Sequence, residues 1–145
     1  MTAGTDTVAG GSGADTITAG ELATTGGAVA TFTAGDTITG GLGADVLNWV
    51  STAAITAAPT GATVTGVETV NVTSGGAVTL TTVTGFTGTT ALNVTSVGDA
   101  NLTAAATTDI TATVSAQAAN GLLVDGGNDV TITASGQLAG LVTVG

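Results

Sequence analysis

A glycine-rich repeat constrains the fold of this chain more than any other feature. Its two clear copies begin at Gly10 and Gly40, and each reads Gly-Gly-x-Gly-Ala-Asp before a short alternation of polar and apolar residues. Glycine tolerates positive φ, so the first half suits a tight turn, and the alternating half suits a strand with one buried face. Stacked units of one turn and one strand predict an all-β chain, a parallel β-roll or β-solenoid whose coils cover each other's apolar faces.

Two looser copies of the repeat extend this pattern toward the N-terminus of each clear copy. They end in Asp6 and Asp36, each nine residues before the aspartate of its clear partner, Asp15 or Asp45. Side chains alternate between the two faces of a strand. The apolar residues two positions after these aspartates are therefore predicted to point inward: Val8, Ile17, Ile38 and Leu47.

The clear copies match the nonapeptide G-G-x-G-x-D-x-U-x, which binds calcium in a parallel β-roll. Calcium takes six to eight oxygen ligands, and glycine turns let main-chain carbonyls converge around a carboxylate. Asp6 is predicted to stack on Asp36, and Asp15 on Asp45. The predicted ligands are these four carboxylates and the carbonyls near Gly4, Gly11, Gly13, Gly35, Gly41 and Gly43. The alternative is an ordinary Gly-Asp turn that the aspartate side chain caps.

The repeat is interrupted between Asp15 and Asp36, which lie 21 residues apart where an uninterrupted roll would place nine. Residues 19–33 are therefore predicted to leave the roll as an excursion, with Glu21 and Leu22 on a loop and residues 28–33 as an added strand. Glu21 is a weaker candidate calcium ligand. Trp49 is large for a narrow roll and is expected to cover an open side beneath the excursion.

A second repeat follows the calcium-binding roll predicted for residues 1–50. Residues 51–66 contain Pro59, the only proline, and are predicted to be a connection. The block that begins at Asn71 aligns with a block at Asn93 and again with one at Leu123. Residues 67–145 are thus predicted to form β-solenoid coils of the same domain, and the chain is expected to be a segment of a longer protein. Asp125 and Asp129 flank a Gly-Gly pair there and are weaker metal candidates.

The charge of the chain excludes several classes of function. It has ten Asp and Glu residues, no Lys, Arg or His, and a net charge of −10. Nucleic acids and anionic membranes are therefore not expected partners. Without His, Lys, Cys, Tyr or Arg, a nucleophile has no base or oxyanion clamp, so an enzyme is not expected. No apolar run approaches the roughly 20 residues of a transmembrane segment. Three acids are expected to be solvated surface charges: Glu68, Asp99 and Asp109.

Threonine triplets of the form Thr-x-Thr offer an alternative function. They begin at Thr16, Thr37, Thr111 and Thr131. Outward threonines stacked in register would form a flat array similar to that of ice-binding β-solenoids, some of which depend on calcium. The plainer interpretation is that threonine is a natural outward residue on a polar strand face. An ice-binding module and a spacer of a calcium-dependent bacterial adhesin stay open as alternatives.

Longer strings of sequence resemble a known family. Together with the nonapeptides, residues 45–50, 66–75 and 116–120 resemble the repeats-in-toxin type of bacterial surface-layer (S-layer) proteins, over nearly the whole chain. The resemblance implies a secreted structural protein that binds Ca²⁺ and assembles with copies of itself into a lattice on the bacterial cell surface. Those proteins hold lipopolysaccharide through a separate segment and carry a C-terminal export signal, and neither is visible in this sequence.

Overall fold

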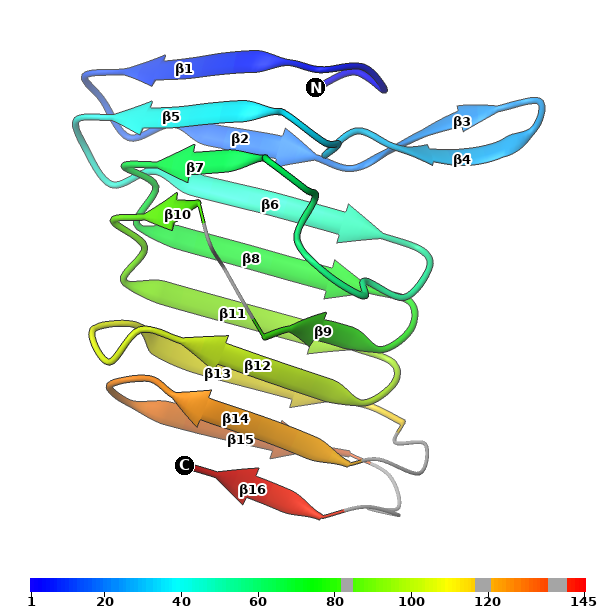
Figure 1. Ribbon diagram of the computed structural model, residues 1–145, viewed down its shortest axis with the longest axis vertical. Coiled ribbons are helices and arrows are strands. Elements are labelled where there is room, and N and C mark those ends of the chain that lie inside the picture. The colour runs from blue at the N-terminus through cyan, green and yellow to red at the C-terminus, as the bar shows by residue number, and fades with distance from the viewer. Residues whose placement is uncertain (82–84, 117–120, 136–140) are drawn as a thin grey trace.

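The protein is a β-solenoid whose parallel strands stack along the long axis of the molecule (Figure 1). The computed structural model describes residues 1–81, 85–116, 121–135 and 141–145; most of the string 116–120 lies outside these ranges. Within them every regular element is a strand. The predicted all-β solenoid is therefore confirmed. None of the described residues forms a helix long and apolar enough to cross a membrane.

Three parallel sheets form the walls of the solenoid. Sheet 1 has the order β1-β5-β7-β10: β1 (Thr7–Gly11), β5 (Thr37–Gly41), β7 (Thr63–Thr65) and β10 (Phe86–Thr87). Sheet 2 has the order β15-β13-β11-β8-β6-β2: β15 (Val130–Ala134), β13 (Asp109–Val114), β11 (Ala91–Ser96), β8 (Thr69–Ser74), β6 (Val46–Ser51) and β2 (Thr16–Ala19). Sheet 3 has the order β16-β14-β12-β9: β16 (Val142–Val144), β14 (Leu122–Gly126), β12 (Ala100–Ala104) and β9 (Val78–Leu80).

The cross-section of the solenoid changes along the chain. The first coils use sheets 1 and 2, the middle coils use all three sheets, and after β10 the described coils use only sheets 2 and 3. In sheet 2, Thr69 lies opposite Ala91, and Ala91 lies opposite Asp109, so the coil shortens from 22 to 18 residues. Sheet 2 is therefore the wall that continues from β2 to β15.

The excursion is an antiparallel hairpin, formed by β3 (Glu21–Thr24) and β4 (Gly27–Ala30), that projects from the solenoid (Figure 1). The prediction of a loop at Glu21 and Leu22 was wrong, because both residues pair across to β4. The added strand also ends three residues earlier than predicted. Main-chain hydrogen bonding closes the base of the hairpin, where Thr31 N donates to Gly20 O at 3.0 Å.

One continuous apolar core fills the solenoid, as the alternation of residues predicts. The inward side chains of Ile38, Leu47, Leu80 and Leu102 are almost fully buried. Residues 51–66 contribute to this core, because they contain β7 and the buried Ile55, which bridges to Val78 of β9. Burial of apolar surface stabilises the folded state by about 25 cal/mol per Å². Neighbouring coils that share this core therefore stabilise one another.

The aromatic residues lie together near the hairpin. Trp49 is buried, and its ring meets the edge of Phe32 with centroids 5.1 Å apart. Phe32 also meets Phe86 of β10, with centroids 6.3 Å apart. Phe32 belongs to the segment that returns from the hairpin to the solenoid, so Trp49 contacts the excursion as predicted, but it lies in the core and does not cover an open side.

The repeat alignment is confirmed for its first two blocks and wrong for the third. Asn71 pairs with Asn93 in sheet 2, as the alignment predicts. The Leu123 block, however, is displaced by half a coil, because Val124 pairs with Leu102 in sheet 3 and Ile132 pairs with Ala112 in sheet 2. The loss of sheet 1 shortens the coil, so the same polar and apolar pattern falls on a different wall.

Candidate metal centre

The Asp15 column, which we define as the stacked turns that end in Asp15, Asp45 and Glu68, joins sheet 1 to sheet 2. Asp15 N donates to Asp45 Oδ1 at 2.7 Å, so these residues stack as the repeat predicts. Asp45 N in turn donates to Glu68 Oε2 at 2.8 Å. The column thus holds three carboxylates in consecutive coils.

Sequence reasoning missed Glu68, which was expected to be a solvated charge and is instead half-buried within the column. Its turn lacks the Gly-Gly-x-Gly signature, and only a single glycine, Gly66, precedes it closely. The available signal lies in the strands: Glu68 directly precedes Thr69, as Asp45 directly precedes Val46, and these two residues are register partners. Strand alignment at a spacing of 23 residues would have found it.

Asp45 has an unusual environment within the column. The residue has no exposed surface, and its Oδ2 atom is buried without a hydrogen-bond partner among the described residues. A buried polar atom without a partner costs about 1–3 kcal/mol, and more when it is charged. The chain has no Lys, Arg or His to neutralise this carboxylate. The position therefore favours an external cation.

Glycines in the column leave space into which main-chain and carboxylate oxygens converge. A Cβ atom at Gly40 would collide with Gly66 O and lie 2.6 Å from Asp45 Oδ2. The same holds one coil earlier, where a Cβ atom at Gly10 would collide with Gly40 O and lie 2.7 Å from Asp15 Oδ2. In both coils a carboxylate oxygen thus lies close to a carbonyl oxygen of the next coil. Calcium prefers this mixture of carboxylate and carbonyl ligands.

The other predicted glycines of this column have structural roles in the close stacking of its turns. Gly41 and Gly43 have φ angles of 114° and 128°, which side chains rarely adopt. Gly11 O accepts a hydrogen bond from Leu42 N at 2.8 Å, and a Cβ atom at Gly43 would come within 2.5 Å of Gly13 O. These glycines allow successive turns to pack backbone against backbone.

The Asp6 column, which we define as the stacked turns that end in Asp6 and Asp36, has different hydrogen bonding. The two oxygens of Asp6 accept from Thr2 N at 2.6 Å and Thr2 Oγ1 at 2.9 Å. The two oxygens of Asp36 accept from Asp6 N at 2.7 Å and Thr33 N at 2.6 Å. The backbone and side-chain hydrogen bonds from Thr2 lower the pKa of Asp6. These contacts are those of carboxylates that cap turns.

The two glycines predicted to supply carbonyls to the Asp6 column are also hydrogen-bonded. Gly4 O accepts from Thr33 Oγ1 at 3.2 Å, and Gly35 N donates to Thr60 O at 3.1 Å. Gly35 has a φ of 80°, which suits its place in the turn. The carboxylates of Asp6 and Asp36 and the carbonyl of Gly4 therefore have protein partners.

Glu21 lies apart from both columns and fastens the hairpin to the turn after β6. Its Oε1 accepts from Ser51 Oγ and Thr52 N, each at 3.0 Å, and its Oε2 accepts from Thr52 Oγ1 at 2.7 Å. Hydrogen bonds from the Thr52 side chain and backbone, followed by that from Ser51, lower the pKa of Glu21. The side chain acts as a clamp in this structure.

Asp125 and Asp129 lie near the opposite end of the molecule, and both are exposed. Asp129 N donates to Asp109 Oδ1 at 3.2 Å, which repeats the stacking of acids between coils at an exposed site. Across the described ranges, no three acidic side chains gather closely enough to hold a metal by themselves. A cation in the Asp15 column would therefore take most of its ligands from main-chain carbonyls.

Comparisons with known proteins do not indicate a function, so the geometry of the Asp15 column is the main basis for proposing one. No protein-family model matches the chain, and no curated protein sequence is similar to it at a significant level. The likeness to S-layer proteins stays an expectation from the sequence motifs. The Asp15 column is the site on which a function is proposed.

Proposed function

We propose that this chain is a calcium-binding structural segment of a secreted bacterial surface-layer protein. One observation carries the proposal: the Asp45 side chain is fully buried between Asp15 and Glu68, and its Oδ2 atom has no hydrogen-bond partner in the described structure. Ca²⁺ would be held by Asp45 Oδ2 and mainly by main-chain carbonyls, among them those of Gly40 and Gly66. The role of the ion is structural, because it joins coils that are otherwise mutually repulsive.

Electrostatics supports a link between calcium and folding. The chain carries ten acids without one Lys, Arg or His, so neutralisation of stacked carboxylates requires an external cation. A ligand that binds only the folded state at 100 times its Kd stabilises that state by about 2.7 kcal/mol per site. Extracellular calcium modules bind with Kd values of roughly 0.1–1 mM. Calcium at concentrations well above these Kd values would order the N-terminal coils.

Binding of Ca²⁺ at the Asp15 column can be tested by unfolding experiments. Thermal and urea unfolding, followed by circular dichroism with calcium or with a chelator, should show a calcium-dependent gain in stability that Asp45→Asn largely removes. Asp109→Asn is the matched control, because Asp109 is exposed and lies outside the Asp15 column. Magnesium should give a much smaller gain, since it demands stricter octahedral geometry. Equal calcium responses in the two variants would contradict the site.

Assembly with copies of the chain is tested separately. Shared calcium would reduce the repulsion between acidic subunits, and the outward Thr and Asn rows would form hydrated contacts. Light scattering and negative-stain microscopy should show ordered assemblies with calcium and dispersed chains with chelator. Anchoring to lipopolysaccharide is assigned to another segment and is not expected of these residues. A calcium-stabilised chain that stays dispersed would favour the spacer of an adhesin.

Ice binding is a second candidate, supported by one specific observation. The exposed pair Thr37 and Thr39 on β5 stacks directly on the exposed pair Thr63 and Thr65 on β7. Neighbouring strands lie about 4.7–4.9 Å apart, so the four hydroxyls form a small regular array. Thermal hysteresis in the presence of calcium, lost in Thr39→Lys, would establish this function. Its absence would leave these threonines as a polar wall.

A further inference from the structure

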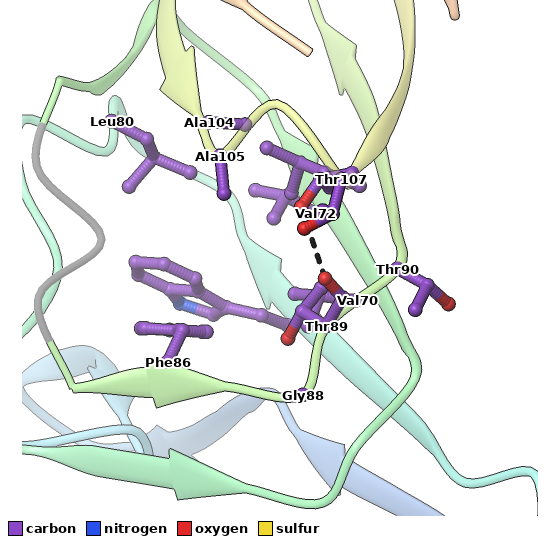
Figure 2. A pocket seen from close by; sticks show the side chains of 13 residues that line it. Val70, Val72, Leu80, Phe86, Gly88, Thr89, Thr90, Ala104, Ala105 and Thr107 are labelled. Carbon is purple, nitrogen blue, oxygen red and sulfur yellow. Dashed lines mark hydrogen bonds between the residues drawn. The ribbon is translucent and has the colours of Figure 1, made fainter. Parts of the chain in front are cut away.

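An apolar cavity of about 190 Å³ lies where the solenoid loses sheet 1. The last strand of that sheet, β10, contributes Phe86 to one side, and the end of β12 with the turn 105–108 contributes Ala104 and Ala105 to the facing side (Figure 2). Trp49 of β6 and Val72 of β8 also line the cavity. Residues of three successive coils thus line the cavity, which opens to solvent at one side.

The cavity follows from the change in cross-section. The turn 105–108 crosses the place of the missing strand and is fixed by Thr108, whose N donates to Ala105 O and whose Oγ1 donates to Thr89 O, each at 3.0 Å. The residues that this turn and the end of β12 present to the cavity are small, so the space above the aromatic rings is not filled. Protein interiors otherwise pack to high density with few voids larger than water.

The lining selects a class of ligand. Aromatic and aliphatic side chains form most of the wall, and the described lining contains no charged side chain. Its polar groups are the hydroxyls of threonines, among them Thr90 and Thr107, which are exposed and lie where the cavity meets solvent. An apolar cavity of about 150 Å³ is large enough to bind benzene. A neutral ring or short branched alkyl group fits this space.

We propose that the cavity binds a small neutral apolar molecule of about six to eight heavy atoms, with any hydroxyl or carbonyl group at the threonine rim. Binding places the apolar part against Trp49 and Phe86 and fills a void that the shortened coil leaves. Anions are excluded by the acidic chain, and cations by the apolar wall. The site is independent of the Asp15 column and of calcium-dependent assembly.

Trp49 makes the test direct, because it is the only tryptophan in the chain. Toluene and 1-hexanol, titrated into the folded chain with and without calcium, should each give a saturable change in tryptophan emission and raise the Tm. Ala105→Leu should abolish both effects by filling the cavity. Ala57→Leu, at an exposed position outside the lining, should leave them unchanged.

Two results would overturn the proposal. One is the absence of a saturable emission change in the folded wild-type chain. The other is a response in Ala105→Leu equal to that of Ala57→Leu, because the probe then binds elsewhere. If Ala105→Leu fails to fold, Thr107→Val supplies a second variant, which removes a rim hydroxyl at nearly unchanged volume, and a weakened response to 1-hexanol in that variant is the expected result.

Discussion

Two aspartates at equivalent places in the repeat, Asp36 and Asp45, differ in what surrounds their carboxylates. Both are fully buried, and both accept a hydrogen bond from the backbone of the preceding coil. Three residues earlier, however, Thr33 donates its backbone N–H to Asp36, whereas Leu42 donates its own to Gly11 O. Asp45 therefore retains an oxygen without a partner in the described structure. One nearby residue separates a capped turn from a candidate cation site.

Glycine substitutions provide a residue-scale prediction with a matched control. Gly40→Ala should destabilise the fold by about 1–3 kcal/mol or more, because the new Cβ would collide with Gly66 O on the next coil. Gly13→Ala should change stability by less than about 0.5 kcal/mol, since nothing lies within 4 Å of its Cβ position. Urea unfolding at fixed calcium measures both. Equal costs would show that the turns do not stack as described.

The Glu21 clamp predicts a dependence of stability on pH. Hydrogen bonds from Thr52 and Ser51 hold the pKa of Glu21 below its ordinary value, so its contribution is present above the unfolded-state pKa and is lost as pH falls through the folded-state pKa. Wild type should therefore melt above Glu21→Gln near neutral pH, and the two Tm values should converge in acid. A difference in Tm that stays constant with pH would contradict the clamp.

At the scale of single elements, sheet 2 is reinforced by a row of asparagines. Asn71 Nδ2 donates to Asn48 Oδ1, and Asn93 Nδ2 donates to Asn71 Oδ1, each at 2.9 Å. These side chains join β6, β8 and β11 across the outer face of the sheet. Such a ladder fixes register, because a slip of one residue would turn the amides inward.

Asn71→Ala should cost about 1–3 kcal/mol, because it removes both side-chain hydrogen bonds of the central residue and leaves two half-buried neighbours without those partners. Thr131 lies in the same row on β15 but is exposed. Thr131→Ala should therefore reduce stability by less than about 0.5 kcal/mol. Chemical denaturation of both variants checks the difference. Comparable losses would remove the special role of the ladder.

The sequence predicted the elements well where local pattern determines them. Alternation identified the buried faces, and the nonapeptide spacing placed Asp15 over Asp45. Residues 21 and 22 were mistaken for a loop because the strands of the hairpin are short and have no buried face to mark them. The Leu123 block was assigned to the wrong wall because sequence pattern alone does not reveal how many walls a coil has.

The candidate site was predicted only in part, because local sequence pattern determines some of its contacts and tertiary packing determines the others. Asp15 and Asp45 share a motif, so their stacking follows from the repeat. Glu68 enters the column through a shorter turn, and its position depends on the register between β6 and β8. The burial of Asp45 and the engagement of Asp36 by Thr33 depend on tertiary packing, which the spacing of residues does not encode.

At the scale of the whole molecule, stability is distributed along a one-dimensional stack. Each coil contacts its neighbours, so ordering spreads from strand to strand. The strands β8 and β11 are paired on both sides in sheet 2, whereas β1 is paired on one side in the described structure. The acidic turns also concentrate repulsion in the first coils. The middle of the stack is therefore its most stable part.

Hydrogen exchange should report this distribution. Amides of β8 and β11 should exchange most slowly, and calcium should raise the protection of β2 and β6 more than that of β15, because the Asp15 column directly precedes β2 and β6. Exchange followed by mass spectrometry with calcium and with chelator measures the difference. A uniform rise in protection would indicate that the whole stack orders as one unit.

The persistence of sheet 2 through every change of cross-section has a consequence for how such molecules vary. A coil of this solenoid can gain or lose a wall, or carry a projecting hairpin, while the residues on sheet 2 keep their partners. The circumference of a coil can therefore vary along the molecule. Sheet 2 is the continuous wall, called the spine here, that coils of unequal length share. Insertions at the corners change the outline of the molecule while the spacing of its spine stays constant.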